Sequence, residues 1–253
     1  MIWKTLVCAL VAFFSSDAVA VVSLAGTRLI FDGRFPEATI EVGNPGSDQV
    51  LIQAWLADAS APPGGNSTLP FVVTPHLAQL PAKGRQMMRV LYEGVGMPIN
   101  RESLLHLYVL EVPRRSEANQ RLSIAVRQRI NVFYRPKGLT GDPAQAAQML
   151  AWHWRAADRG TLSVRNPTPF HVVLQRLALN GIEVSEDLMI EPFSERTLPV
   201  TGSVSDQAAS GGLSFKALTD YGGQREFCAR VLTDTPFNAR LRRPGAQSSI
   251  GKC

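Results

Sequence analysis

The sequence has few cysteines and histidines, and it lacks the common motifs of enzymes and metal sites. Three cysteines among 253 residues exclude a disulfide-dense small protein and a zinc module with two CxxC pairs. The chain contains no HExxH or GxSxG sequence and no complete dinucleotide-binding loop. A Ser/His/Asp arrangement stays open, because its members can lie far apart in sequence. No motif supports one, so we expect no catalytic residue, no metal and no cofactor.

Long runs of one charge are also absent. The net charge of +5 permits a nucleic acid, an anionic membrane or an acidic protein as partner. The arginines are scattered, and their densest groups are Arg114/Arg115, Arg127/Arg129 and Arg240/Arg242/Arg243. None of these groups is a long basic run with interleaved aromatic residues, so we expect no nucleic-acid partner.

Residues 1–20 have the features of a secretory signal peptide. Lys4 provides a positive start, and the apolar run from Thr5 to Phe14 is too short to span a bilayer. Ala18-Val19-Ala20 has the small–x–small pattern that signal peptidase accepts, so we expect cleavage near Ala20; an uncleaved anchor is the alternative. No later segment approaches the length of a transmembrane helix. We therefore expect an exported, soluble protein without membrane insertion.

Two cysteines would remain after cleavage, because Cys8 lies within the signal peptide. In an oxidising compartment Cys228 and Cys253 can pair, and the bridge would contribute about 3 kcal/mol. Free or intermolecular thiols are the alternative, since Cys253 is the last residue and chain ends are often frayed.

Short runs of alternating apolar and polar residues dominate the rest of the chain, and Pro, Gly and Asn separate them. In the first part this pattern predicts strands over 21–31, 38–42, 50–57, 70–74, 86–92, 104–112 and 121–134. Seven strands are the number that an immunoglobulin-like sandwich needs. Thr74-Pro75 is a candidate for a cis peptide bond.

Residues 135–141 are the best candidate for a linker, because Pro and Gly flank a polar stretch without apolar periodicity. A short helix is predicted over 143–150. Strands then resume over 151–156, 161–165, 170–178, 196–200, 213–219 and 226–232. The polar tail after Thr235 is expected to be loop with one last strand at most. The fold class that follows is all-β, with a second, less regular sandwich.

The predicted strand over 121–134 is unusually long. Leu122, Ile124 and Val126 alternate with smaller or polar residues. At the edge of a sheet, such a strand would offer free backbone groups and branched apolar side chains to another chain. The alternative is an ordinary central strand whose apolar face fills its own core, and alternation by itself favours that alternative.

Several stretches resemble the periplasmic pilus chaperones of the chaperone–usher pathway, the PapD-like family. They follow the family's order over nearly the whole mature chain. The matching stretches are SLAGTRLIFDG at 23–33, QAW at 53–55, RESLL at 101–105, VPRRS at 112–116, RQRINVFYRP at 127–136, NPTPF at 166–170 and TDYGG at 219–223.

The resemblance implies a periplasmic binding protein of two immunoglobulin-like domains, 21–137 and 138–253, set in an L around a cleft. It implies pilin subunits as clients, an outer-membrane usher as second partner, and no catalysis. A pilin lacks its last strand and exposes an apolar groove. The chaperone lends the missing edge by donor-strand complementation, a role that falls here to Leu122, Ile124 and Val126.

The resemblance also implies two groups of charged residues. In the family, an Arg and a Lys hold the pilin's terminal carboxylate; the Arg corresponds to Arg28, whereas the Lys position is Asn131. Asn has no charge, and Arg129 two residues earlier points to the same side of the strand, so we expect Arg28 and Arg129 to share the anchor with Asn131 assisting. The family's interdomain charge cluster corresponds to Glu102, Arg135 and Asp220.

Two other interpretations compete with a pilus chaperone. One is another exported immunoglobulin-like module, such as an adhesin or a carbohydrate-binding protein, which has no need for Arg28 and Arg129 to converge. The other is a secreted hydrolase on a β-sandwich, which predicts polar residues clustered in a pocket. A chaperone predicts a basic cleft beside an exposed apolar edge.

Overall fold

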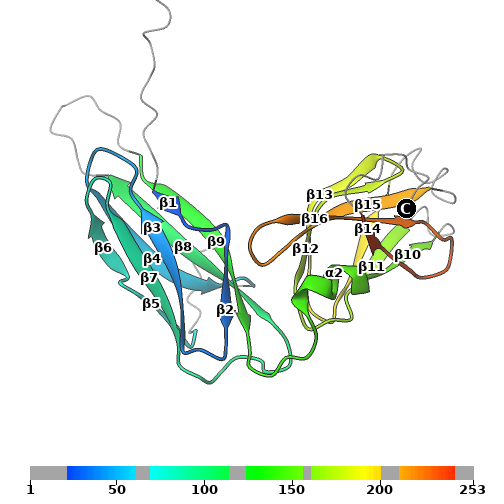
Figure 1. Ribbon diagram of the computed structural model, residues 1–253, viewed down its shortest axis with the longest axis horizontal. Helices are drawn as coiled ribbons and strands as arrows, with labels where there is room; N and C mark the ends of the chain where they lie inside the picture. The colour runs from blue at the N-terminus through cyan, green and yellow to red at the C-terminus, as the bar shows by residue number, and fades with distance from the viewer. Residues whose placement is uncertain (1–21, 61–68, 114–123, 156–160, 201–210, 243–253) are drawn as a thin grey trace, which may run out of the picture.

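The computed structural model describes residues 22–60, 69–113, 124–155, 161–200 and 211–242, and every structural statement below concerns these. They form four β-sheets, two in each of two lobes. Figure 1 shows the lobes joined at one end and diverging like the arms of an L. The predicted all-β fold is confirmed; the boundary between 137 and 138 stays a prediction.

The N-terminal lobe is a sandwich of a four-stranded and a five-stranded sheet. One sheet has the order β1-β3-β7-β5 and the other β2-β9-β8-β4-β6. The strands are β1 (Ser23–Leu24), β2 (Arg28–Asp32), β3 (Glu37–Gly43), β4 (Val50–Asp58), β5 (Phe71–Thr74), β6 (Leu77–Leu80), β7 (Arg85–Tyr92), β8 (Ser103–Pro113) and β9 (Val126–Arg135).

The core of this lobe follows from the alternation in the sequence. Alternate residues of β2 and β8 are buried, and β9 adds Ile130, Val132 and Tyr134 to the core between the sheets. Aromatic rings from four strands pack together at one end of this core. Phe31 lies 5.6 Å from Phe71 in an edge-to-face contact, and Tyr92 lies 4.7 Å from both Phe71 and Tyr134. Burial of such rings is the largest apolar contribution a side chain can make.

The C-terminal lobe pairs a four-stranded sheet, β14-β11-β10-β17, with a five-stranded sheet, β13-β12-β15-β16-β18. Trp152 and Trp154 point into the core between them and are fully buried. The elements are a 3₁₀ turn (Pro143–Gln145), α2 (Ala146–Met149), β10 (Ala151–Arg155), β11 (Thr161–Arg165), β12 (Val172–Leu179), β13 (Ile182–Ile190), β14 (Glu195–Pro199), β15 (Gly212–Leu218), β16 (Gln224–Arg230), β17 (Phe237–Asn238) and β18 (Arg240–Leu241). Within the described ranges, no helix has the length and apolar character that crossing a membrane requires.

Most predicted strands are confirmed within one or two residues, and the peptide bond between Thr74 and Pro75 is cis. The predicted strand over 21–31 is wrong as one element. It divides into β1, which pairs with β3, and β2, which runs parallel to β9 in the other sheet. Such a change of sheet is invisible to alternation, because both halves keep the same period of two.

Two internal strands were not predicted. β6 has only four residues and begins two positions after Pro75, and β13 carries acidic side chains on an exposed edge, so neither shows a clear alternation of apolar residues. The tail contains two short strands, β17 and β18, where one at most was expected. Each has two residues, which is too short for a periodic signal.

Candidate functional site in the cleft between the lobes

Arg135, the last residue of β9, forms the centre of an ion-pair cluster that joins the two lobes. Its Nε and Nη2 donate to Glu102 Oε1 at 3.0 and 2.7 Å, and its Nη1 and Nη2 donate to Asp220 at 3.0 and 3.2 Å. Glu102 precedes β8, whereas Asp220 lies in the turn between β15 and β16, which points at the N-terminal lobe (Figure 1). The guanidinium fork therefore bonds to one carboxylate from each lobe.

The electrostatics of this cluster favour the charged form of Arg135. Burial acts to lower its pKa, but the hydrogen bonds to Asp220 and the negative charges of Glu102 and Asp220 outweigh burial and raise the pKa above its ordinary value. The Glu102 side chain is only 2% exposed. A carboxylate this deep needs its partners, because an unpaired buried charge is costly.

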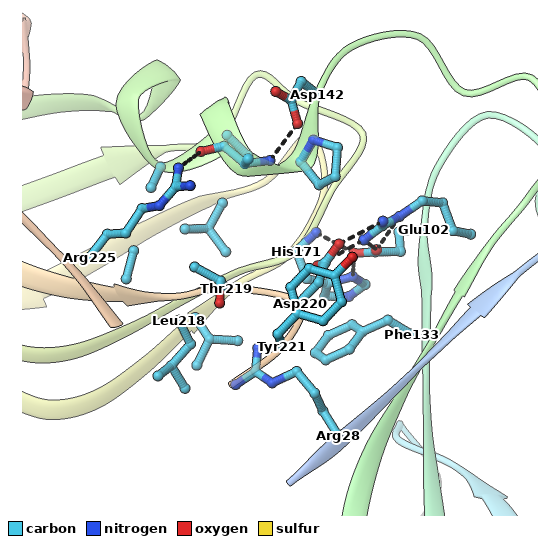
Figure 2. A pocket seen from close by; sticks show the side chains of 18 of the residues that line it. Arg28, Glu102, Phe133, Asp142, His171, Leu218, Thr219, Asp220, Tyr221 and Arg225 are labelled. Atoms are coloured by element: carbon cyan, nitrogen blue, oxygen red, sulfur yellow. Dashed lines mark hydrogen bonds and ion pairs between the residues drawn. The ribbon is translucent and has the colours of Figure 1, made fainter. Parts of the chain in front are cut away.

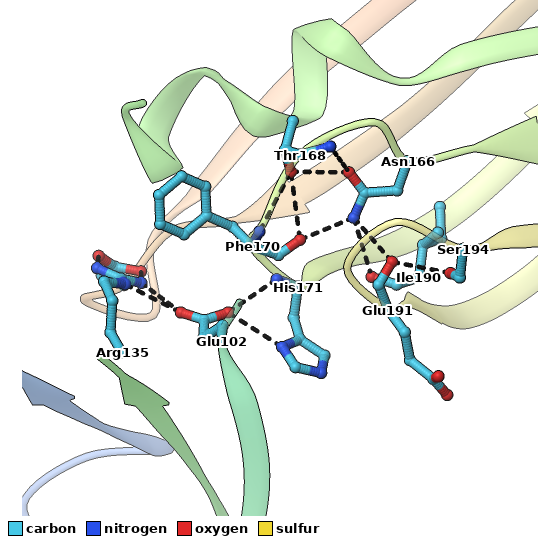
Figure 3. A network of polar contacts seen from close by, with 10 residues as sticks. Glu102, Arg135, Asn166, Thr168, Phe170, His171, Ile190, Glu191 and Ser194 are labelled. Carbon is cyan, nitrogen blue, oxygen red and sulfur yellow. Dashed lines mark hydrogen bonds and ion pairs between the residues drawn. The ribbon is translucent and has the colours of Figure 1, made fainter. Parts of the chain in front are cut away.

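Sequence reasoning missed the contribution of His171. Its backbone N–H donates to Glu102 Oε2 at 2.7 Å, and its Nδ1 lies 3.1 Å from the same oxygen (Figure 3). The Phe133 ring of β9 packs against the imidazole, with centroids 5.4 Å apart. The signal that could have found His171 is its position directly after the NPTPF stretch at 166–170.

Asn166 stabilises the turn that precedes His171. Its Nδ2 donates to the carbonyls of Phe170 at 2.7 Å and Glu191 at 3.0 Å, while its Oδ1 accepts from Thr168 N at 3.0 Å and Oγ1 at 2.7 Å (Figure 3). Asn166 is fully buried. In the turn that Asn166 stabilises, the Pro169 carbonyl accepts a hydrogen bond from the backbone N–H of Glu102 at 2.9 Å. The hydrogen bonds of Asn166 in the C-terminal lobe therefore help to position Glu102 of the N-terminal lobe.

A cavity of about 350 Å³ lies between the lobes, next to the cluster. Arg28 reaches into it from β2, beside Phe133 and Tyr221 (Figure 2). The Arg28 guanidinium carbon lies 5.8 Å from the centre of the Phe133 ring, and its buried Nε has no hydrogen-bond partner within the described residues. Burial lowers the Arg28 pKa, and the charges of Asp220 and Glu102 only partly offset this.

The structure places Arg28 and Asn131 side by side. They are register partners in the parallel pair of β2 and β9, and both point away from the core because Leu29 and Val132 point into it. Arg129 lies on the same face, two residues before Asn131. It is exposed, and its register partner on β8 is Tyr108. The predicted anchor residues therefore share one face of the sheet.

The expectation that residues 121–134 form one unpaired strand is wrong for the second half. From Asn131 to Tyr134, β9 is flanked by β2 on one side and β8 on the other. From Val126 to Ile130, β9 pairs with β8 alone. The segment that precedes β2 in the chain does not continue along β9, because it belongs to the other sheet as β1. The free edge is therefore short, contains Arg129 and ends directly before Asn131.

The predicted donor residues fall on different parts of this segment. Val126 is the first residue of β9 and is partly buried, and Ile124 precedes the strand with 64% of its surface exposed. Leu122 lies outside the described residues.

Cys228 of β16 is disulfide-bonded. Cys253 also lies outside the described residues, so its pairing with Cys228 stays a prediction.

Family models match both lobes of the chain. The model of the pili and flagellar-assembly chaperone, PapD N-terminal domain, matches residues 21–140, and that of the pili assembly chaperone PapD, C-terminal domain, matches residues 145–229. The chain belongs to the PapD family.

Relatives of this PapD-family chain are similar over most of their length. The protein named "Probable fimbrial chaperone YadV" of Escherichia coli K12 is 36% identical, over 86% of this chain and 93% of its own. The chaperone protein FimB/FhaD of Bordetella pertussis is 34% identical, over 88% and 93%.

Solved structures agree in fold. The crystal structure of the YadV chaperone has a TM-score of 0.68 at 32% identity and covers 83% of this chain and 99% of its own. A structure of the Salmonella enterica SafA pilin in complex with the SafB chaperone has a TM-score of 0.72 at 27% identity, with coverages of 85% and 99%.

Proposed function

We propose that this PapD-family chain is a periplasmic chaperone that binds and caps pilin subunits by donor-strand complementation and delivers them to an outer-membrane usher. The observation that carries the proposal is the free edge of β9 at Val126–Ile130, which lies directly before the anchor face of Arg28 and Asn131. The family models over both lobes and the complex of the SafA pilin with the SafB chaperone support it. Export to the periplasm would follow from the signal peptide at 1–20.

The edge would serve the pilin as a replacement strand. Backbone groups of Val126–Ile130 that face away from β8 would form a ladder with the pilin, and Leu122, Ile124 and Val126 would enter its apolar groove. Burying three aliphatic side chains would contribute about 5–8 kcal/mol before the cost of ordering the two chains.

The cleft would hold the carboxylate at the end of the pilin. Arg28 supplies a buried Nε without an acceptor in the described part of the chain, and a carboxylate would satisfy it with a charge-assisted hydrogen bond. Asn131 beside it would donate an uncharged N–H. Arg129 would add charge from the same face, so an Arg129→Ala variant should bind pilin more weakly than the parent.

Co-purification tests the proposal. The chain is exported together with a pilin from its own organism that becomes insoluble when produced alone, and the soluble complex is recovered from the periplasm. With an Ile124→Asp variant, the amount of soluble pilin recovered should be at least tenfold lower than with the parent, because a charge would have to enter the apolar groove. Val95→Asp is the matched control, since Val95 is equally exposed, at 69%, on a distant turn.

The outcome that contradicts the proposal is a pilin that stays insoluble with the parent chain, or one that the Ile124→Asp and Val95→Asp variants recover equally well.

Family membership and the cleft geometry do not favour an adhesin, a carbohydrate-binding module or a hydrolase. Among the described residues, no group of three or more His, Cys, Asp or Glu side chains could hold a metal ion.

A further inference from the structure

Three polar side chains form one row across the outer face of the sheet, and the first of them, Arg28, lines the cavity between the lobes. Arg28 of β2 is the register partner of Asn131 of β9, and Asn131 is the register partner of His106 of β8. Neighbouring strands are about 4.8 Å apart, so His106 lies as close to Asn131 as Arg28 does. All three point to the outer face, because Leu105 and Leu107 beside His106 are buried in the core.

The surroundings of His106 lower the pKa of its imidazole in the free protein. Burial lowers its pKa most, the positive charge of Arg129 on β9 lowers it further, and Asp58 on β4 partly opposes both. The edge of Tyr108, two residues along β8, packs against the imidazole with centroids 6.1 Å apart. Arg28 on β2 is the other charged group of the row. The imidazole is thus a base that a new negative charge nearby would protonate.

We propose that His106 is a further residue of the pilin carboxylate site, where it binds the carboxylate across Asn131 from Arg28 and takes up a proton from solvent as it does so. This inference rests on the proposed function and deepens it. Asn131 leaves the middle of the row without a charge, and a carboxylate above it would lie between Arg28 on one side and His106 on the other. The protonated imidazole would donate one charge-assisted hydrogen bond to it.

Arg129 does not make this role redundant. Arginine stays charged at every physiological pH, so its contribution to binding is constant. His106 contributes its charge only when protonated, and the binding of the carboxylate and of the proton are therefore linked. The client would be held more tightly in mildly acidic than in mildly alkaline surroundings.

The sign and size of the effect follow from the linkage. A neighbouring carboxylate raises the pKa of His106 in the complex above that in the free protein, so affinity rises as pH falls through the bound-state pKa and levels off below the free-state pKa. A difference of about one pKa unit corresponds to about a tenfold change in Kd. The peptide carboxylate has a pKa of about 3.5 and stays ionised above pH 5.

The test uses the mature chain and a short synthetic peptide of alternating valine and threonine that ends in a free carboxylate. Calorimetric titration between pH 5.5 and 8.5 should show a Kd that falls about tenfold toward low pH. His106→Gln should flatten this profile, whereas His76→Gln, which removes an exposed histidine on the turn before β6, should leave it unchanged. The peptide with an amidated end should bind more weakly and without the same pH dependence.

A second measurement follows the imidazole itself. The His106 Hε1 resonance, assigned from its loss in the His106→Gln variant, should titrate with a pKa about one unit higher in the presence of the carboxylate peptide than in its absence. An Asn131→Lys variant should bind the peptide with a weaker pH dependence, because a permanent charge then occupies the middle of the row.

Different failures point to different errors. If the carboxylate peptide binds but His106→Gln keeps the full pH profile, or if the amidated peptide shows that profile too, the role of His106 is overturned and the proposed function stands. If neither peptide binds the parent chain at any pH in this range, the carboxylate site itself is wrong, and this inference falls with it.

Discussion

At the scale of single residues, Glu102 and Asn166 are buried polar side chains that each form several hydrogen bonds. Glu102 receives hydrogen bonds from Arg135 and His171, and its own backbone N–H donates to Pro169. Asn166 uses both its donor and its acceptor within one turn. Removing one member of such a network leaves a buried partner without a bond, which costs more than the bond itself contributes.

An Asn166→Ala variant should therefore be strongly destabilised. The substitution leaves the buried N–H of Thr168 without its acceptor. It also removes one donor each from the carbonyls of Phe170 and Glu191, which keep only the hydroxyls of Thr168 and Ser194. We expect a loss of about 3 kcal/mol in the free energy of unfolding, measured by urea denaturation. Asn100→Ala, at an exposed loop position, is the control and should leave the midpoint unchanged. Equal midpoints for both variants would contradict this role of Asn166.

At the scale of elements, β9 has two halves with different partners. Residues 131–134 are held from both sides by β2 and β8, whereas Val126–Ile130 have only β8. The cause is the departure of the chain before β2 into the other sheet as β1. One strand thus provides both a rigid attachment to its own sandwich and a short edge that can accept a further strand.

Hydrogen exchange should separate the two halves. In the free protein, backbone amides of Val126–Ile130 that point away from β8 should exchange quickly, and those of Asn131–Arg135 slowly. Binding of a pilin should slow exchange in the first group and leave the second unchanged, because only the first group gains ladder partners. Slowing confined to another edge, such as β13, would show that the pilin adds its strand elsewhere.

At the scale of the whole molecule, the cluster around Arg135 links the two lobes. Arg135 and Glu102 belong to the N-terminal lobe, Asp220 and His171 to the C-terminal lobe, and the cavity with Arg28 lies beside them. Buried ion pairs contribute more to a fixed geometry than to net stability, which suits a joint that must hold a cleft open.

Arg135→Ala should loosen this joint. Glu102 and Asp220 would lose their shared counter-charge and repel each other, so we expect a broader distribution of distances between the lobes in small-angle scattering and a lower yield. Arg34→Ala removes an exposed ion pair with Asp32 near the start of the same lobe and is the control. Scattering and melting curves that match the parent would refute the role of Arg135.

Alternation in the sequence predicted the fold class and most strands, and the resemblance to the PapD-like family predicted which charged residues lie at the cleft. Alternation with a period of two decides which side chains are buried, and it is a local property that any stretch of chain displays. It could not reveal the change of sheet between β1 and β2, nor the strands β6 and β13, where the apolar pattern is short or interrupted.

The addition of His106 and His171 to these groups follows from tertiary contacts that no sequence pattern contains. The parallel pairing of β2 with β9 places Arg28 beside Asn131, and the pairing of β9 with β8 adds His106 to the same row. The contact of the two lobes brings His171 to Glu102. These neighbours come from distant parts of the chain, and the register that joins them depends on how the whole sandwich packs rather than on any local preference.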